Sequence, residues 1–201
     1  MDTTTPSASP APDAVSLELD APLELENWRP LVQWILAIPH LFISGALNAV
    51  SEALGVVSFF TVLFTRQIPG GIYNFQVMIL RYRTRVGMYV GFTHGQYPKF
   101  EFAMTPADPG GDPLRIDVER ATSWRWQNAF NWFLAIPHFV VLLVYGIGAW
   151  VLWVINFFII LFTGKWNEGH RAFVVKVARY QTRVFAYVLM LRNEYPSFSL
   201  S

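Results

Sequence analysis

Two long apolar runs dominate the hydrophobic pattern of the chain. Residues 30–65 contain a single charged side chain, Glu52, and residues 127–164 contain none. A membrane-spanning helix needs about 20 apolar residues, and one helix of about 36 residues would reach ~54 Å, beyond a hydrocarbon core of about 30 Å. We therefore predict that each run forms a membrane hairpin of two short helices, with turns near residues 48–52 and 145–149.

An amphipathic segment follows each apolar run. Apolar and aromatic side chains fall on one face of a helix between residues 71 and 96, and residues 169–194 repeat this pattern. The arginines beside these apolar faces are Arg81, Arg85, Arg179 and Arg183. An aromatic-rich face edged by arginine is typical of a helix that lies in a membrane interface, where guanidinium groups meet lipid phosphates. The other interpretation is an amphipathic helix packed on protein.

Short stretches with alternating apolar and polar residues flank these helices. Residues 15–20 and 114–119 alternate as half-buried strands do, and shorter stretches follow at residues 100–102 and 198–200. Residues 106–113 are rich in proline, glycine and aspartate, which indicates a linker between two halves. Four short strands can pair into one small cytoplasmic sheet that joins these halves.

The chain repeats its short motifs at an offset of 98 positions, which is the mark of two copies of one structural unit. The residues of this repeat signature are Pro39, His40, Tyr97 and Pro98, followed by Pro137, His138, Tyr195 and Pro196. We assign residues 1–14 to a disordered tail, residues 15–105 to the first unit and residues 114–201 to the second. The predicted fold is a mostly α integral membrane protein. Each unit holds a strand, a membrane hairpin, an interfacial helix and a second strand.

Composition and charge also point to a membrane. Apolar residues make up 53% of the chain and charged residues 14%, against about 25% charged in an average soluble domain. Basic residues stand at both ends of each apolar run: Arg29 and Arg66, then Arg125 and Lys165. By the positive-inside tendency, both ends of each run then face the cytoplasm. We expect an even number of crossings, or hairpins that only dip into the bilayer, with cytoplasmic termini.

His40 and His138 are the only histidines related by the repeat. Two equivalent imidazoles could ligate a haem, as in b-type membrane cytochromes. In the other interpretation the proline bends the helix and the ring bonds a carbonyl that the proline releases. One histidine per unit is little evidence for a cofactor, so we expect neither a cofactor nor a metal.

The charged side chains near the membrane allow two interpretations each. An ionisable residue in an apolar run, such as Glu52, suggests a functional site, yet a carboxylate at the hairpin turn explains it as well. The four arginines could contact anionic lipid phosphates, each contributing about 1 kcal/mol. They could instead pair with acidic residues of the sheet, namely Glu18, Asp20, Asp117 and Glu119.

These motifs together resemble an uncharacterised bacterial membrane-protein family, the domain of unknown function 4389, which is common in actinobacteria. The matching elements are an apolar-Pro-His start, Leu-Phe-Thr, Arg-Tyr-x-Thr-Arg-Val and a closing Tyr-Pro-x-Phe, all present twice between Trp28 and Leu200. The resemblance implies the bacterial cytoplasmic membrane and supplies no catalytic residue. The units differ where Arg66-Gln67 stands for Gly164-Lys165 and Arg83 for Gln181.

No catalytic signature accompanies these features. The chain lacks a Gly-x-Ser-x-Gly elbow, a glycine-rich phosphate loop and a His-Glu-x-x-His helix. Our leading hypothesis is a non-enzymatic, multi-pass inner-membrane protein that organises lipid or supports a membrane complex. The expected partners are membrane lipids, anionic ones among them, and a membrane protein or a second copy, with no nucleic acid. The alternatives are a transporter or lipid-translocation subunit and a b-type haem redox subunit.

Overall fold

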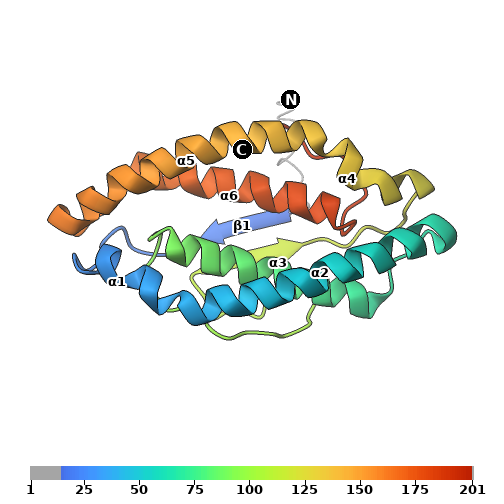
Figure 1. Cartoon of the computed structure of the whole chain (residues 1–201), viewed down its shortest axis with the longest axis horizontal. Coiled ribbons are helices and arrows are strands. Elements are labelled where there is room, and N and C mark those ends of the chain that lie inside the picture. Colours follow the sequence, from blue (N-terminus) through green and yellow to red (C-terminus); the bar gives the residue numbers. More distant parts are fainter. Residues whose placement is uncertain (1–14, 201) are drawn as a thin grey trace, which may run out of the picture.

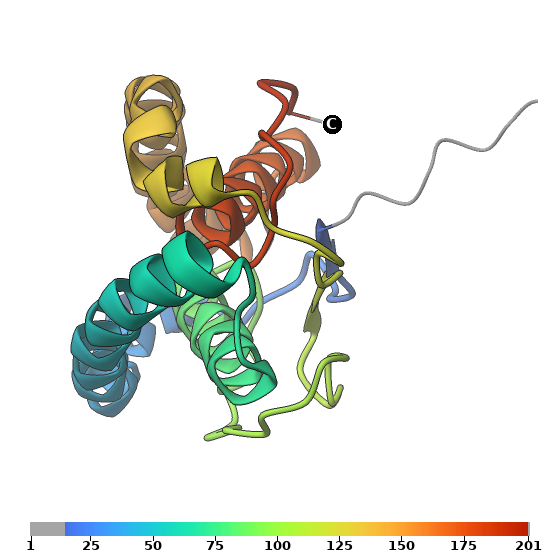
Figure 2. The ribbon, with the colours of Figure 1, turned by 90° about the vertical axis from the view of Figure 1, so that its right-hand side faces the viewer.

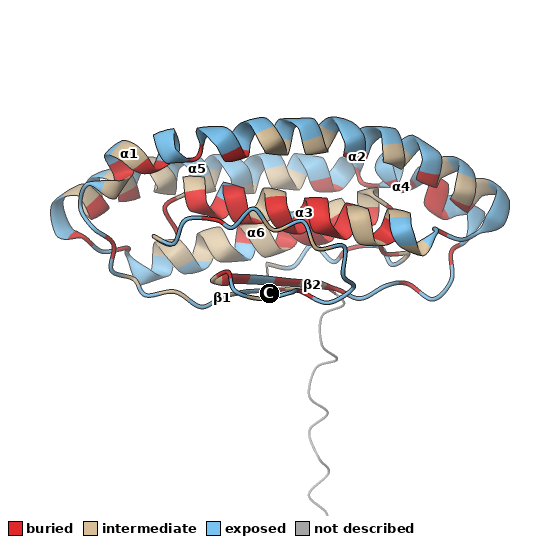
Figure 3. Cartoon of the chain, turned by 90° about the horizontal axis from the view of Figure 1, so that it is seen from below, coloured by how far each residue is buried: buried red, intermediate tan, exposed pale blue. Residues whose placement is uncertain are grey.

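The structure consists of three layers. The computed structural model describes residues 15–200, so the tail predicted at residues 1–14 lies outside the described part. The elements in chain order are β1 (Val15–Leu19), α1 (Arg29–Leu36), α2 (Ile38–Thr65), α3 (Gly70–Val90), β2 (Leu114–Val118), the 3₁₀ helix η1 (Trp126–Phe130), α4 (Asn131–Leu134), α5 (Ile136–Thr163) and α6 (Glu168–Val188). The long helices α2 and α5 form one outer layer, α3 and α6 form the middle layer, and the two strands form the other outer layer (Figure 3).

Each apolar run forms a short helical segment followed by one long helix, so the predicted hairpin turns are wrong. Helices α2 and α5 have 28 residues each and pass without a break through both predicted turns. The actual breaks lie at Ala37 and Ala135, one residue before each long helix begins. Pro39 and Pro137 occupy the first turn of the new helix, where a missing N–H is tolerated. The break near the start of each run therefore divides it into a short helical segment and one long helix, and not into two short helices of similar length.

The two predicted amphipathic helices are present as α3 and α6, and both end earlier than the sequence predicts. They stop at Val90 and Val188, well before the Tyr-Pro motifs. Phe92 and Met190 then adopt left-handed backbone angles, with φ of 60° and 59°. The N–H of Thr93 donates to the carbonyl of Met88, as the Schellman motif requires. A left-handed residue therefore ends each helix.

The sheet has two strands where four were predicted. Strands β1 and β2 pair antiparallel, with Leu17 opposite Ile116 at the centre. Residues 100–102 and 198–200 form no strand in the described part of the chain. Their aromatic side chains pack instead against histidines of the long helices, as described below.

Each strand covers the amphipathic helix of the other unit. Leu17 of β1 packs against Val174 and Ala178 of α6. Arg81 of α3 donates to the carbonyl of Ile116 in β2, at 2.8 Å. The two units are therefore interleaved, with α2 and α5 running in opposite directions (Figure 1) and the strands on the side away from them (Figure 2).

Candidate functional site

Helices α2 and α5 bury polar side chains and expose apolar ones, which is the reverse of helices in soluble proteins. We call this pattern inverted burial. The side chains that α2 buries are mostly polar: His40, Ser51, Ser58 and Val62. Many of its apolar side chains are exposed, and Phe42 and Phe64 are 77% and 76% exposed. Helix α5 has the same character, since it buries His138 and Asn156 and exposes Phe162. Monomeric soluble proteins rarely expose apolar patches of more than a few hundred Å².

The inward polar side chains explain the repeat signature. The Nδ1 of His40 and the hydroxyl of Tyr82 share a hydrogen bond of 2.7 Å. The ring of Phe100 stacks on the imidazole at 4.2 Å, and Tyr97 meets its edge at 4.8 Å. The Tyr-Pro-x-Phe motif therefore closes an aromatic box around the histidine of its own unit.

The second unit contains the same box. The Nδ1 of His138 and the hydroxyl of Tyr180 share a hydrogen bond of 2.6 Å. Phe198 stacks on the imidazole at 4.2 Å, and Tyr195 lies at 4.7 Å. Four positions from three distant stretches of sequence thus meet in each unit, at equivalent places.

These boxes do not fit a haem held between His40 and His138. Both imidazoles are fully buried, and a phenyl ring covers one face of each. Each Nε2 is buried without a hydrogen-bond partner among the described residues, so a porphyrin iron has no open approach to it. The described residues also contain no cluster of three His, Cys, Asp or Glu side chains that could hold a metal.

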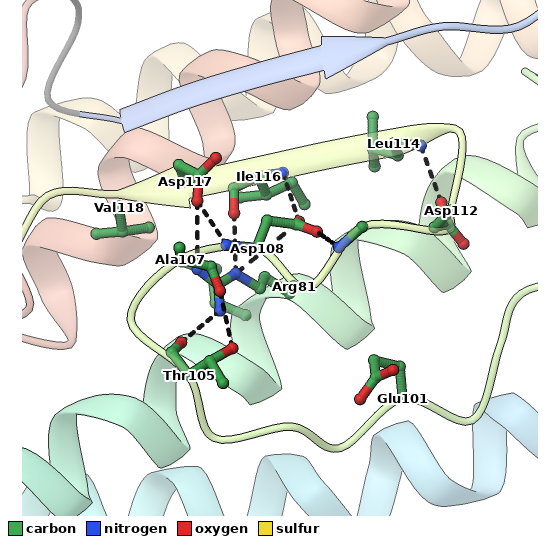
Figure 4. A network of polar contacts seen from close by, with 12 residues as sticks. Arg81, Glu101, Thr105, Ala107, Asp108, Asp112, Leu114, Ile116, Asp117 and Val118 are labelled. Carbon is green, nitrogen blue, oxygen red and sulfur yellow. Dashed lines mark hydrogen bonds and ion pairs between the residues drawn. The ribbon is translucent and has the colours of Figure 1, made fainter.

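Arg81 of α3 lies beneath β2 (Figure 4), and Arg85 follows one turn later on the same helix. They are 2% and 3% exposed. Arg85 donates to both carboxylate oxygens of Asp108, at 2.7 and 2.8 Å, and Arg81 lies 3.6 Å from Asp117. Burial lowers the pKa of the Arg81 guanidinium, and the two aspartates oppose that shift. Both arginines are thus bound to protein oxygens. The pair of Arg81 with Asp117 is one of the contacts with acidic sheet residues that the sequence allowed.

Arg179 and Arg183 also face inward. Arg179 donates to the carbonyl of Leu17 in β1 through two nitrogens, at 3.2 and 3.0 Å. Arg183 donates to the carbonyl of Ser199 and lies over the ring of Tyr180. The geometry favours a structural role over headgroup contact for all four arginines. The helical periodicity could not indicate this, because the covering segments lie outside the helices. A strand of the other unit covers Arg81, Arg85 and Arg179, and the closing segment of its own unit covers Arg183.

Two amides that the sequence analysis overlooked hold the ends of the amphipathic helices. Gln33 donates to the carbonyls of Tyr89 and His94, at 2.7 and 2.9 Å. Asn131 occupies the equivalent position and donates to the carbonyl of Tyr187 at 2.9 Å. The sequence did contain a signal for these residues, because Gln33 and Asn131 are amides at the same repeat position of the two apolar runs.

A cavity of about 910 Å³ lies between the two units. Helices α2, α3 and α6 supply most of its lining, which is largely apolar and includes Phe59, Met88 and Phe185. Neither signature histidine lines it. Cavities of about 300–1,000 Å³ with a few convergent polar groups are typical ligand sites.

The polar groups of the cavity include one cation and one carboxylate. Glu52 lies in the middle of α2 and not in the loop that the sequence predicted, and its Oε1 accepts from Asn48 at 2.7 Å. Arg83 reaches from α3 to the ring of Phe185 on α6, at 5.8 Å. Neither Arg83 nor Glu52 forms an ion pair with a residue that the structure describes. Gln181, the repeat equivalent of Arg83, also lines the cavity.

A family model described as Domain of unknown function (DUF4389) matches the chain twice, over residues 27–101 and 125–199. The chain belongs to this family. Each match of the DUF4389 family contains a complete aromatic box, from the Pro-His start to the closing phenylalanine, and excludes the two strands. Comparisons with curated proteins and with solved structures give no match.

Proposed function

We propose that this protein is embedded in one leaflet of a membrane, where it organises lipids without catalysing a reaction. The observation that carries the proposal is the inverted burial of α2 and α5. Their exposed apolar faces form one outer layer, and the strands with their charged side chains form the opposite one (Figure 3). A slab with one apolar face is suited to lie in a bilayer surface.

An orientation within the membrane plane agrees better with the charges than a crossing does. Helices α3 and α6 run alongside the long helices, so they would enter the hydrocarbon with them. That would place exposed charges such as Lys176 on α6 and Arg115 on β2 in the bilayer, at about 2.5–3.5 kcal/mol for each at its centre. In the plane, the apolar layer meets acyl chains while the sheet stays in water.

The basic residues at the helix ends fit the same orientation. Arg29 and Arg66 flank α1 and α2, and Arg125 and Lys165 flank the equivalent helices of the second unit. A helix lying in the surface holds both of its ends at headgroup depth, where anionic lipids attract basic side chains. We place the protein in the cytoplasmic leaflet of a bacterial inner membrane. This arrangement replaces the crossings predicted from length alone and leaves no translocation path to the other leaflet.

Insertion into one leaflet has a mechanical consequence. Helices of 28 residues are ~42 Å long, and two of them displace lipid on one side of the bilayer only. We therefore expect the protein to favour curved membranes. Vesicles that keep their shape and size at high protein density would contradict this part of the proposal.

Cysteine labelling in proteoliposomes tests the orientation, because the natural chain has no cysteine. Phe42→Cys and Phe64→Cys place a thiol near either end of the exposed face of α2, and Arg115→Cys places one on the sheet. With a membrane-impermeant maleimide, we expect Arg115→Cys to react from one side and both α2 variants to stay unreactive from either side. Reaction of an α2 variant from the side opposite to that of Arg115→Cys would show a crossing and refute the in-plane orientation.

A further inference from the structure

The cavity between the two units opens onto the proposed membrane face. Three of its lining residues, Val56, Phe60 and Trp132, also belong to the exposed apolar surface, being 59%, 51% and 54% exposed. The cavity therefore connects directly with the layer that the proposed function places among acyl chains. A lipid can enter it sideways from the leaflet, with its headgroup between Glu52 of α2 and Arg83 of α3.

The charges in the cavity are unusual for such a location. Arg83 and Glu52 both line it, and neither has an opposite charge within ion-pair distance among the described residues. Charged groups near hydrocarbon are costly unless they are paired and hydrogen-bonded. The site as a whole is electrically neutral but dipolar, so a ligand that carries both charges matches it better than an anion does.

We propose that this cavity binds one phospholipid whose headgroup carries a phosphate and a primary ammonium, as an ethanolamine headgroup does. The phosphate pairs with Arg83, and the ammonium donates to Glu52, which Asn48 holds in place. The acyl chains lie along apolar lining such as Phe59 and Phe185 and leave through the open side. This proposal rests on the proposed membrane location.

The two units contribute different residues to the cavity, and this difference determines how many lipids the protein binds. In the second unit the repeat equivalents of Glu52 and Arg83 are Trp150 and Gln181. Only the first unit therefore supplies the charge pair, and Gln181 adds a neutral amide to the same cavity. The chain offers one headgroup site and not two, so we expect one tightly held lipid per protein molecule.

The test is lipid retention by the full chain. The protein is reconstituted in phosphatidylcholine vesicles that contain equal mole fractions of phosphatidylethanolamine and phosphatidylglycerol, extracted gently, and analysed by native mass spectrometry. We expect one phosphatidylethanolamine per chain. Soluble phosphoethanolamine is added as a competitor, and we expect it to displace the lipid poorly because it lacks the chains. Displacement at equimolar competitor would overturn the lipid assignment in favour of a free-headgroup site.

Three variants locate the site. Arg83→Gln copies the residue of the second unit and removes the phosphate contact, which we expect to reduce retention roughly tenfold or more. Glu52→Gln should keep phospholipid binding but lose the preference for ethanolamine over glycerol headgroups. Lys176→Gln removes an exposed charge on α6 outside the cavity and should change neither.

Each contrary outcome has a separate meaning. Equal retention of phosphatidylglycerol by the natural chain would overturn the role of Glu52. A protein that floats with vesicles but retains no lipid, or whose Arg83→Gln variant retains it unchanged, would overturn the cavity site and leave the membrane location intact. Failure of the natural chain to float with vesicles would overturn the proposed function itself. Melting curves of the variants, followed by circular dichroism, ensure that only folded protein is compared.

Discussion

At the scale of single residues, the repeat signature is a set of mutual contacts. The histidine after each proline bonds a tyrosine of the amphipathic helix, and the closing Tyr-Pro-x-Phe covers the imidazole. A buried imidazole in an apolar setting needs such a partner, because an unsatisfied polar group costs about 1–3 kcal/mol. The residues of the repeat signature therefore stabilise the fold of each unit.

Removing either tyrosine hydroxyl tests these contacts. In Tyr82→Phe or Tyr180→Phe the Nδ1 of a buried histidine loses its partner, so we expect the free energy of unfolding to fall by about 1–3 kcal/mol in each case. Urea unfolding in detergent micelles measures it. Tyr145→Phe is the control, because its hydroxyl has no hydrogen-bond partner among the described residues. Equal stability of all three variants would contradict the argument.

Tyr73 makes stability depend on alkaline pH. Burial raises the pKa of its hydroxyl from 10.0 to about 12, with Arg81 and Arg120 opposing the shift, and the hydroxyl donates to the carbonyl of Val118 at 2.8 Å. The unfolded chain therefore releases this proton first as pH rises. Stability present below pH 10 should fall between pH 10 and 12, by on the order of 2–3 kcal/mol from this residue. Tyr73→Phe should flatten that part of the unfolding profile, and an unchanged slope would count against the assignment.

At the scale of the elements, the two long helices end alike with different residues. Arg66 and Gly164 both adopt left-handed angles, with φ of 54° and 67°. That conformation costs a non-glycine residue about 1–2 kcal/mol. A Cβ on Gly164 would also lie 2.8 Å from Oδ1 of Asn27 and 3.1 Å from the carbonyl of Leu25. The second unit needs its glycine, whereas the first unit tolerates strain.

Exchanging these cap residues should change stability in opposite directions. We expect Arg66→Gly to raise the free energy of unfolding by up to about 1 kcal/mol and Gly164→Ala to lower it by roughly 1–2 kcal/mol. Thermal unfolding of the two variants gives the sign. Gly45→Ala serves as the control inside α2, because open space surrounds that position and alanine should stabilise the helix by about 0.5–1 kcal/mol. A gain of stability in Gly164→Ala would contradict the strain argument.

The elements also show what sequence reasoning could reach. The starts of α3 and α6, the strands β1 and β2 and the two-unit organisation follow from periodicity and repetition, which are local properties. The hairpin turns were wrong because Glu52 and the glycines near residue 147 interrupt the apolar pattern without breaking a helix. A helix interior tolerates a glycine at about 1 kcal/mol when packing outweighs it.

The candidate site was harder to predict from the sequence than the fold was. The difference between Arg83 and Gln181 was visible, but nothing local places either beside α2 or indicates that a cavity separates the units. Likewise, the burial of Arg81 depends on β2, which lies about 35 residues further along the chain. The position of Arg83 in the cavity and the burial of Arg81 both depend on contacts between distant segments. Periodicity alone could therefore predict neither.

At the scale of the whole molecule, the strands couple the two units energetically. Leu17 is fully buried between β2 and α6. Leu17→Ala should therefore cost about 2–5 kcal/mol, although the residue belongs to the first unit. We expect hydrogen exchange to speed up first in α6, not in α3. Glu18→Ala on the exposed side of β1 should change stability by no more than about 0.5 kcal/mol. Faster exchange confined to the first unit would contradict this coupling.

The interleaved strands carry a consequence for how such a molecule arises. In this fold each strand covers the amphipathic helix of the other unit and not that of its own. A chain with a single copy of the unit would therefore leave its amphipathic helix exposed. Such a chain would cover that helix by forming a two-fold homodimer with exchanged strands, which is a low-cost route to dimers. Gene duplication and fusion would then convert that dimer into the present architecture. Fusion would also free the two halves to diverge, so that one side of the former symmetry axis could acquire a charge pair that a homodimer would have to carry twice.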